Sequence, residues 1–183
     1  MRLFTALDLP GDVIENLSGL LDRLRPTARI QWSVPANLHV TTKFIGNWPD
    51  EQFDELKQGL QQIEPRAPIA VRIRNLGFFP NARSPRVFWC GIEAPGLEDL
   101  ATATDKATSP LGIPSENRPF SPHLTLARIK EPVNLDRLRQ TTEALPLLDF
   151  GSFEANSFFL YQSQLRPTGS VYTKLAEFPF SQR

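Results

Sequence analysis

The sequence predicts an α+β fold in which antiparallel-rich sheets are flanked by helices. Segments of alternating apolar residues, which are typical of strands, are interleaved with segments whose apolar residues recur every three to four positions, which is typical of helices. Short turn-forming stretches separate several of the strands, as in hairpins. This interleaving favours the α+β class, and 183 residues suffice for one domain or for two small lobes that share a core.

The first half of the chain opens with a predicted strand over residues 2–9, which Pro10-Gly11 ends. A helix is predicted over 12–25, because its leucines recur at helical spacing and Asp12 suits a helix start. The elements predicted next are a short strand near 30–32, a strand over 38–45 stopped by Gly46-Asn47, a helix over 50–63, and strands over 69–77 and 86–93 around the loop 79–85.

The second half follows a similar order. A helix is predicted over 96–108, and the proline-rich stretch 110–122 is predicted to be irregular. The remaining predicted elements are a strand over 123–129, a helix over 134–144, and extended segments over 148–162 and 171–178 joined by a turn over 166–169.

Charge and cysteine content narrow the function classes. Twenty basic residues balance twenty acidic ones, which argues against a protein that coats nucleic acid through long-range attraction. An RNA substrate would therefore be held at one end by a small local site. The single cysteine, Cys90, excludes an internal disulfide and is expected to pack as a small hydrophobe. The N-terminal apolar run is too short for a signal peptide or a membrane span, so a cytoplasmic protein is expected.

The only two histidines share one local pattern. They stand in His39-Val40-Thr41-Thr42 and His123-Leu124-Thr125-Leu126, and a threonine follows each histidine two residues later. Both phrases fall in predicted strands, where residues two apart point to the same face. Two such strands side by side would place two imidazoles and two hydroxyls around one cavity.

This set of groups suits the opening of a cyclic phosphodiester. A base must take a proton from water and an acid must protonate the departing sugar oxygen, and two imidazoles can hold opposite protonation states near neutral pH. Threonine hydroxyls can bind the non-bridging phosphate oxygens. A structural role for each histidine is the alternative interpretation. A zinc site is a weaker one, because zinc usually needs three or four protein ligands and the chain offers no third histidine.

At these residues the chain resembles the two-histidine phosphoesterase superfamily, in particular its RNA 2′,3′-cyclic phosphodiesterase (LigT/ThpR-like) family. The superfamily hallmark is a pair of His-x-Thr/Ser-x tetrapeptides, which both phrases satisfy. The resemblance covers nearly the whole chain: R-L-F-T-A-L-D-L-P at the start, H-V-T-T-K-F-I-G, P-R-V-F-W-C-G-I, R-P-F-S-P-H-L-T-L-A-R, and the closing Y-Q-S-Q-L-R-P-T-G-S-V-Y-T-K-L-A-E-F.

The resemblance implies a single domain over residues 1–183 with two pseudo-symmetric lobes around a central cleft, one motif on each lobe. It also implies hydrolysis of RNA 2′,3′-cyclic phosphate ends to 2′-phosphomonoesters without a metal or other cofactor, and some members also join RNA through 2′–5′ linkages. His39 would be the proton donor to the leaving oxygen and His123 the proton acceptor from water. Thr41 and Thr125 map to the phosphate-binding hydroxyls.

Residues around the two motifs give weaker expectations. Thr42 stands where the family commonly has an apolar residue, and strand alternation should turn it away from His39. Arg128 matches the family's trailing arginine, a candidate phosphate contact, but it would reach the His123 face only if the strand ended or bulged. Lys43 could share the motif face, although a surface lysine is the favoured interpretation.

Aromatic and basic residues are candidate RNA contacts. Phe78, Phe79 and Trp89 are candidates for stacking on a nucleobase, and either Tyr161 or Tyr172 could line the cleft. Phe79 and Tyr161 are the possible base or RNA contacts among them. Packing in the core is the favoured interpretation for each of Phe78, Phe79 and Trp89. Arg83 and Arg86, beside the loop 79–85, could contact a phosphate of the RNA tail or simply be solvated.

Two other function classes stay open. One is an RNA-end or nucleotide binding module with little catalysis, and the other keeps the chemistry but acts on small cyclic nucleotides or 2′–5′ oligonucleotides. The expected partner is RNA with cyclic phosphate ends, such as tRNA fragments, with no membrane association. A monomer is expected, because one chain can supply both histidines.

Overall fold

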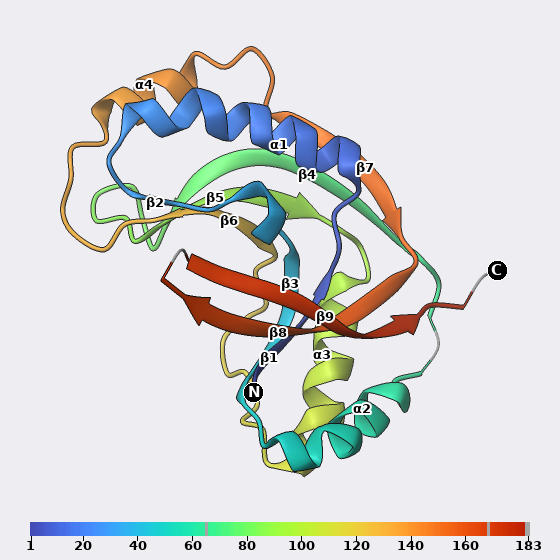
Figure 1. The fold of residues 1–183 in the computed structure, drawn as a ribbon. Helices are drawn as coiled ribbons and strands as arrows, with labels where there is room; N and C mark the ends of the chain where they lie inside the picture. The colour runs from blue at the N-terminus through green and yellow to red at the C-terminus, as the bar shows by residue number, and fades with distance from the viewer. Residues whose placement is uncertain (65, 168, 182–183) are drawn as a thin grey trace.

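The computed structural model describes residues 1–64, 66–167 and 169–181, in which α-helices are interspersed among single strands and runs of two or three strands (Figure 1). The strands are β1 (Arg2–Leu7), β2 (Gln31–Trp32), β3 (Val40–Asn47), β4 (Ile69–Phe79), β5 (Val87–Glu93), β6 (His123–Arg128), β7 (Asp149–Ala155), β8 (Ser157–Arg166) and β9 (Gly169–Pro179). The α-helices are α1 (Gly11–Leu24), α2 (Phe53–Gln61), α3 (Leu97–Thr108) and α4 (Asp136–Glu143). Short 3-10 turns are η1 (Arg25–Thr27), η2 (Pro35–Asn37), η3 (Asp50–Gln52) and η4 (Ser109–Leu111).

The strands form two antiparallel sheets. The four-stranded sheet has the order β3-β1-β8-β9, and the five-stranded sheet has the order β2-β6-β5-β4-β7. All pairings among the described strands are antiparallel. The α+β prediction with antiparallel-rich sheets is therefore confirmed, and each sheet takes strands from both halves of the sequence.

Most predicted elements are present, with corrections at their ends. Gly46-Asn47 does not stop β3, because Gly46 has a φ of +84° beside a β-bulge and bends the strand within the sheet. The predicted single segment over 148–162 is two strands that break at Asn156 and enter different sheets. The helix predicted over 50–63 begins as η3. The predicted turn over 166–169 includes Thr168, which lies outside the described residues.

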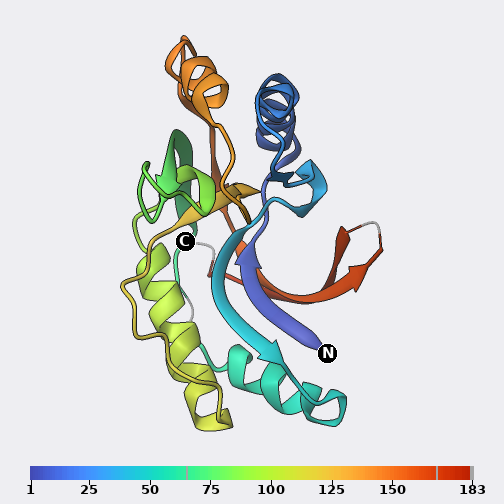
Figure 2. The ribbon, with the colours of Figure 1, turned by 90° about the vertical axis from the view of Figure 1, so that its left-hand side faces the viewer.

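Helices cover the sheets in two pairs (Figure 2). Helices α1 and α4 lie side by side at one end of the molecule, where α1 packs on β7 of the five-stranded sheet. Helices α2 and α3 lie together at the other end, where α3 packs on β3 and α2 on β9. The stripe of α1 that faces the core is apolar and buried, and consists of Val13, Leu17, Leu20, Leu21 and Leu24. Each such side chain stabilises the fold by roughly 2 kcal/mol.

A short connection joins the two sheets at the candidate site. Strand β2 pairs with β6, and the chain then passes through η2 into β3 of the other sheet. Ser33, just after β2, donates from its amide to Leu126 O (2.8 Å) and from its hydroxyl to Thr125 O (2.7 Å). His39 follows only six residues later, which limits its separation from Ser33 to about 20 Å. Strands β3 and β6 also contact each other directly.

None of the helices in the described part of the chain is long and apolar enough to cross a membrane.

Candidate active site

His39 rests on an aromatic surface of the four-stranded sheet. The sequence predicts it inside a strand, but it lies directly before β3. Its ring stacks on Phe4 (centroids 4.6 Å apart, planes at 27°) and meets Tyr172 edge-on (5.0 Å, 80°). Phe4 and Tyr172 thus contact the imidazole from two sides, one through its face and the other edge-on.

The surroundings of His39 favour its neutral form. Burial lowers the pKa of His39 below its ordinary value, while a hydrogen bond to the Asn37 backbone and the charge of Asp8 raise it by less. This hydrogen bond to the main chain of Asn37, two residues before His39, also orients the His39 ring. Asn37 is itself held, because its side-chain amide donates to Ser170 O of β9 (2.7 Å).

Asp8 organises a polar cluster beside His39. Its carboxylate accepts hydrogen bonds from the Tyr161 hydroxyl and from Lys174 Nζ. The ammonium of Lys174 lies 3.8 Å from the centroid of the Phe159 ring. Burial and the Asp8 carboxylate raise the pKa of Tyr161, so the phenol stays protonated. Its hydroxyl is thus already used by Asp8, and its ring packs on Phe4 (5.3 Å, 9°).

His123 is the first residue of β6 and is exposed. Its Nδ1 lies 2.7 Å from Ser121 O, and because a carbonyl only accepts, Nδ1 carries the proton in this contact. In the neutral ring Nε2 then has the free lone pair and can accept a proton. Both histidines are therefore oriented by the main chain two residues earlier, His39 by Asn37 and His123 by Ser121.

The two motif threonines are half-buried. Neither the Thr41 nor the Thr125 hydroxyl makes a hydrogen bond to another described residue, so both are available to a ligand. Thr125 pairs across the sheet with Trp89, which shares its face. The indole lies over Gly77 on β4, where a Cβ atom would come within 2.2 Å of the ring. Glycine at this position allows Trp89 to lie against the sheet beside Thr125.

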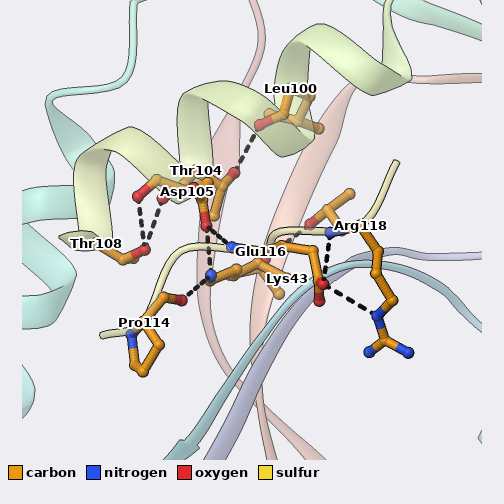
Figure 3. Close-up of polar contacts among 10 residues, drawn as sticks. Lys43, Leu100, Thr104, Asp105, Thr108, Pro114, Glu116 and Arg118 are labelled. Atoms are coloured by element: carbon orange, nitrogen blue, oxygen red, sulfur yellow. Dashed lines mark hydrogen bonds and ion pairs between the residues drawn. The ribbon is translucent and has the colours of Figure 1, made fainter. Parts of the chain in front are cut away.

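A β-bulge corrects both interpretations of Lys43. Thr5 pairs with Lys43 and Ala6 with Thr41, so Thr42 is an extra residue in β3 and alternation is broken there. The Thr42 hydroxyl bonds the buried Thr5 hydroxyl (2.7 Å). Lys43 neither shares the motif face nor lies on the surface. It is 7% exposed, pairs with Asp105 of α3 and donates to Pro114 O (2.6 Å; Figure 3).

Lys43 and Asp105 fasten the irregular segment that leads to His123. Asp105 also accepts from the Glu116 amide (3.1 Å), and Glu116 accepts from Arg118 (Figure 3). Burial would raise the pKa of Asp105, but the hydrogen bonds from Lys43 and Glu116 outweigh it and lower that pKa. One ion pair thus connects β3, α3 and the residues before β6. The prediction that 110–122 is irregular is confirmed apart from its first two residues, which end η4.

A second β-bulge turns Arg128 toward the His123 face. Trp89 pairs with Thr125 and Phe88 with Ala127. The residue between Thr125 and Ala127 therefore has no partner and is extra in β6. Arg128 then pairs with Val87, which alternates onto the same face as Trp89. The bulge required for Arg128 to share the face of His123 is therefore present, and the arginine is exposed.

The other candidates divide between the two faces of the five-stranded sheet. Core packing is wrong for Phe79, which is 58% exposed because it stands at the end of β4, where it pairs with Val87 on the face of His123. Phe78 points to the opposite face, packs on Phe88 (5.0 Å) and lies beneath Arg139, so its predicted packing role is confirmed. Cys90 is buried as predicted, and burial raises its pKa to about 12. Arg83 and Arg86 line a cavity beyond the end of the sheet.

Sequence reasoning missed Phe4 and Asp8, the residues that support His39. Each lies two residues from Ala6, which indicates a shared face but not which residue they meet. Phe44 was missed too: it is 67% exposed, and its ring lies 6.3 Å from Phe4. Among the described residues, no three His, Cys, Asp or Glu side chains are grouped so that they could hold a metal ion.

Comparison with known proteins places the chain in a family. The sequence matches the family described as LigT like Phosphoesterase over residues 7–89 and 92–172, which include both histidine motifs. The chain belongs to the LigT-like phosphoesterase family.

Two relatives of this LigT-like phosphoesterase, from different organisms, have the same name. A protein of Methanocaldococcus jannaschii is 33% identical over 177 residues, which cover 97% of this chain and 99% of the relative. One from Thermus thermophilus is 35% identical over 186 residues, covering 97% and 89%. Each is named RNA 2′,3′-cyclic phosphodiesterase.

Solved structures of the family share the fold. The crystal structure of a Thermus thermophilus protein has a TM-score of 0.81 at 34% identity and covers 98% of both chains. That of Escherichia coli LigT complexed with 3′-AMP has a TM-score of 0.77 at 29% identity and covers 99% of this chain and 98% of the other. The predicted LigT-like fold is confirmed.

Proposed function

We propose that this protein hydrolyses 2′,3′-cyclic phosphate ends of RNA to 2′-phosphomonoesters. Relatives that match nearly the whole chain are named for this substrate, and both sequence motifs of the family are intact. The observation that carries the proposal is the paired arrangement of two imidazoles, each oriented by the main chain two residues earlier and each followed by a threonine hydroxyl that no described residue occupies.

In the proposed reaction a water oxygen attacks phosphorus and the bond from phosphorus to O3′ breaks. Nε2 of His123 takes a proton from the water, and His39 gives a proton to the departing O3′. The Thr41 and Thr125 hydroxyls donate to the non-bridging oxygens, and Arg128 adds positive charge on the same face as His123. The chain's own groups supply each proton transfer, so the reaction should proceed in chelator without a cofactor.

The lowered pKa of His39 bears on which histidine donates a proton and which accepts one. A proton donor must be protonated before it acts, and burial favours neutral His39. If His39 is the donor, activity should fall as pH rises through this lowered pKa. The Asp8 carboxylate opposes the effect of burial and so keeps more of His39 protonated.

The names and structures of the relatives limit the range of substrates but do not reduce it to one. Escherichia coli LigT was solved with 3′-AMP, which supports a site that takes the terminal nucleotide. Small cyclic nucleotides as substrates, and 2′–5′ RNA ligation as the reverse type of reaction, are compatible with the same groups.

We further propose that the protein is a cytoplasmic monomer. One chain supplies both histidines, and Cys90 is a buried thiol without a disulfide partner.

The test is digestion of an RNA oligomer with a 2′,3′-cyclic phosphate in the presence of chelator. Wild type should yield a 2′-phosphate, and His39→Ala and His123→Ala should each lose activity by about two to four orders of magnitude. Circular dichroism checks that each variant is folded. Full activity in either variant, or intact cyclic ends with folded wild type, would refute the proposal.

A further inference from the structure

The face of the five-stranded sheet that carries His123 continues beyond the catalytic groups. Along β6, His123 is followed on this face by Thr125 and, after the bulge, by Arg128. Arg128 lies opposite Val87, and Val87 lies opposite Phe79 on its other side. A cation and an aromatic ring therefore flank the end of the sheet, on the face where the phosphate would be bound.

Phe79 is unusual among the aromatic residues of this sheet. Its ring is 58% exposed at the end of β4, whereas Phe88 on the neighbouring strand is buried. Exposed aromatic rings beside a positively charged groove are the surfaces on which single-stranded RNA bases stack, with about 1–3 kcal/mol per base.

A cavity of about 320 Å³ opens directly beyond this end of the sheet. It lies between the loop after β4, the loop after β6 and the start of α4. Its charged lining residues are Arg83, Arg86, Arg139, Glu131 and Asp136. Ile129, the residue after Arg128, also lines it and donates from its amide to Arg86 O (2.9 Å). The cavity is thus joined to the face that carries Arg128.

Two of the three arginines of this cavity are held in place, and none of the three is neutralised. Arg86 donates to Lys130 O (3.0 Å), and Arg139 donates to Ala82 O and lies over Phe78 (5.4 Å). No ion pair joins any of the three arginines to a carboxylate within the described chain, and Nε of Arg139 is buried without a partner. Three positive charges against the two carboxylates leave one in excess. That balance suits a phosphodiester, which carries a single negative charge.

We propose that Phe79 and this arginine-lined cavity form a subsite for the RNA tail, which binds a stacked base and a backbone phosphodiester on the 5′ side of the cyclic end. The inference rests on the proposed function of the catalytic site. From Thr125 to Ile129 the strand advances about 13 Å, so the subsite serves nucleotides close to the end. Such a subsite explains how a chain of zero net charge can select RNA, because it contacts only the few nucleotides next to the cyclic end.

The experiment measures kcat/KM for a 2′,3′-cyclic mononucleotide and for oligomers of two to ten nucleotides with the same cyclic end. Wild type should gain over the first few nucleotides and then level off. Arg83→Ala/Arg86→Ala should lose about tenfold on the oligomers and stay within about twofold of wild type on the mononucleotide. The matched control is Arg23→Ala/Arg137→Ala, which has the same net charge and removes two exposed arginines outside the cavity.

Two further measurements separate charge from stacking. The slope of log affinity against log salt for an oligomer should become shallower by about 0.7 for each phosphate that the arginine variant no longer neutralises. Phe79→Leu, which keeps the apolar bulk but not the ring, should weaken oligomer binding without changing that slope. Arg86→Lys should retain most of the affinity, because it keeps the charge.

Binding of a labelled oligomer with a 2′-phosphate end, followed by anisotropy, makes the inference independent of turnover. Equal oligomer affinity for wild type and Arg83→Ala/Arg86→Ala, or equal loss in the control variant, would overturn the tail subsite. Cleavage of cyclic ends with no dependence on length would overturn it too, while leaving the proposed reaction intact. Absence of cleavage together with arginine-dependent binding would instead reject the proposed reaction alone.

Discussion

At the scale of single residues, the protonation state of His39 depends on its immediate neighbours. Phe4 and Tyr172 bury its ring, and burial lowers its pKa, whereas the carboxylate of Asp8 acts in the opposite direction. The Asp8 carboxylate is itself fixed by Tyr161 and Lys174. Small changes at Asp8 should therefore appear in the protonation of His39 and not in the architecture of the sheet.

Asp8→Asn tests this coupling through the pH profile of kcat/KM. Removing the negative charge leaves burial less opposed, so the pKa of His39 should fall further. With His39 as proton donor, the basic limb of the profile should move to lower pH and the acidic limb should stay. If the acidic limb moves instead, His39 is the proton acceptor. Two unmoved limbs would show that Asp8 has no electrostatic effect on His39. Asp149→Asn, a carboxylate paired with Arg72 on the five-stranded sheet, is the control.

At the scale of secondary-structure elements, two β-bulges decide which side chains share a face. The sequence predicts strands at both motifs because the apolar pattern is regular there, and β3 and β6 are present. It does not reveal where an extra residue shifts the alternation, because a bulge depends on the partner strand. Both interpretations of Lys43 are wrong for this reason. The sequence allows a bulge before Arg128, but only the pairing with Val87 shows it.

The Lys43–Asp105 pair yields a prediction about stability. Asp105→Asn leaves a buried ammonium without its counter-charge and should reduce the free energy of unfolding in urea by about 3 kcal/mol. Lys43→Met should cost less, because its methyl group can fill the buried site and the Asp105 carboxylate is partly solvated. Wild-type urea resistance in Asp105→Asn would contradict this account.

The same pair sets the sign of a pH effect. Because the folded-state pKa of Asp105 is lowered, its contribution is complete above the pKa of the unfolded chain and is lost as pH falls through the folded value. Wild type should therefore lose stability toward acid more steeply than Asp105→Asn. Urea midpoints measured from about pH 7 down to about pH 3 give the comparison, and parallel curves would exclude Asp105 as a contributor.

At the scale of the whole molecule, the two sheets share one buried core, and each contains strands from both halves of the chain. The pairing of β1 with β8 joins residues more than 150 positions apart. No local pattern predicts such a neighbour, which explains why Phe4 and Tyr161 could not be placed together from the sequence. The family resemblance, in contrast, predicted the fold class correctly because its motifs extend over nearly the whole chain.

A shared core predicts that the molecule unfolds as one unit. Trp48 is buried beside the four-stranded sheet and Trp89 lies in the five-stranded sheet. Variants that keep only one of them, Trp32→Phe/Trp89→Phe and Trp32→Phe/Trp48→Phe, should each show the same urea midpoint by fluorescence as by far-ultraviolet circular dichroism. Fluorescence and dichroism midpoints that separate within either variant would indicate sheets that unfold independently.

The central position of β1 has a consequence for synthesis on the ribosome. This strand leaves the ribosome before β3 and can pair with it early, but its other neighbour, β8, is translated more than 150 residues after β1. A nascent chain that stops just after residue 128 would already contain both histidines. It would still lack Tyr161 and Tyr172, and with them much of the aromatic surface on which His39 lies. The enzyme should therefore remain inactive toward RNA, including the message and transfer RNAs around it, until β8 and β9 have been translated.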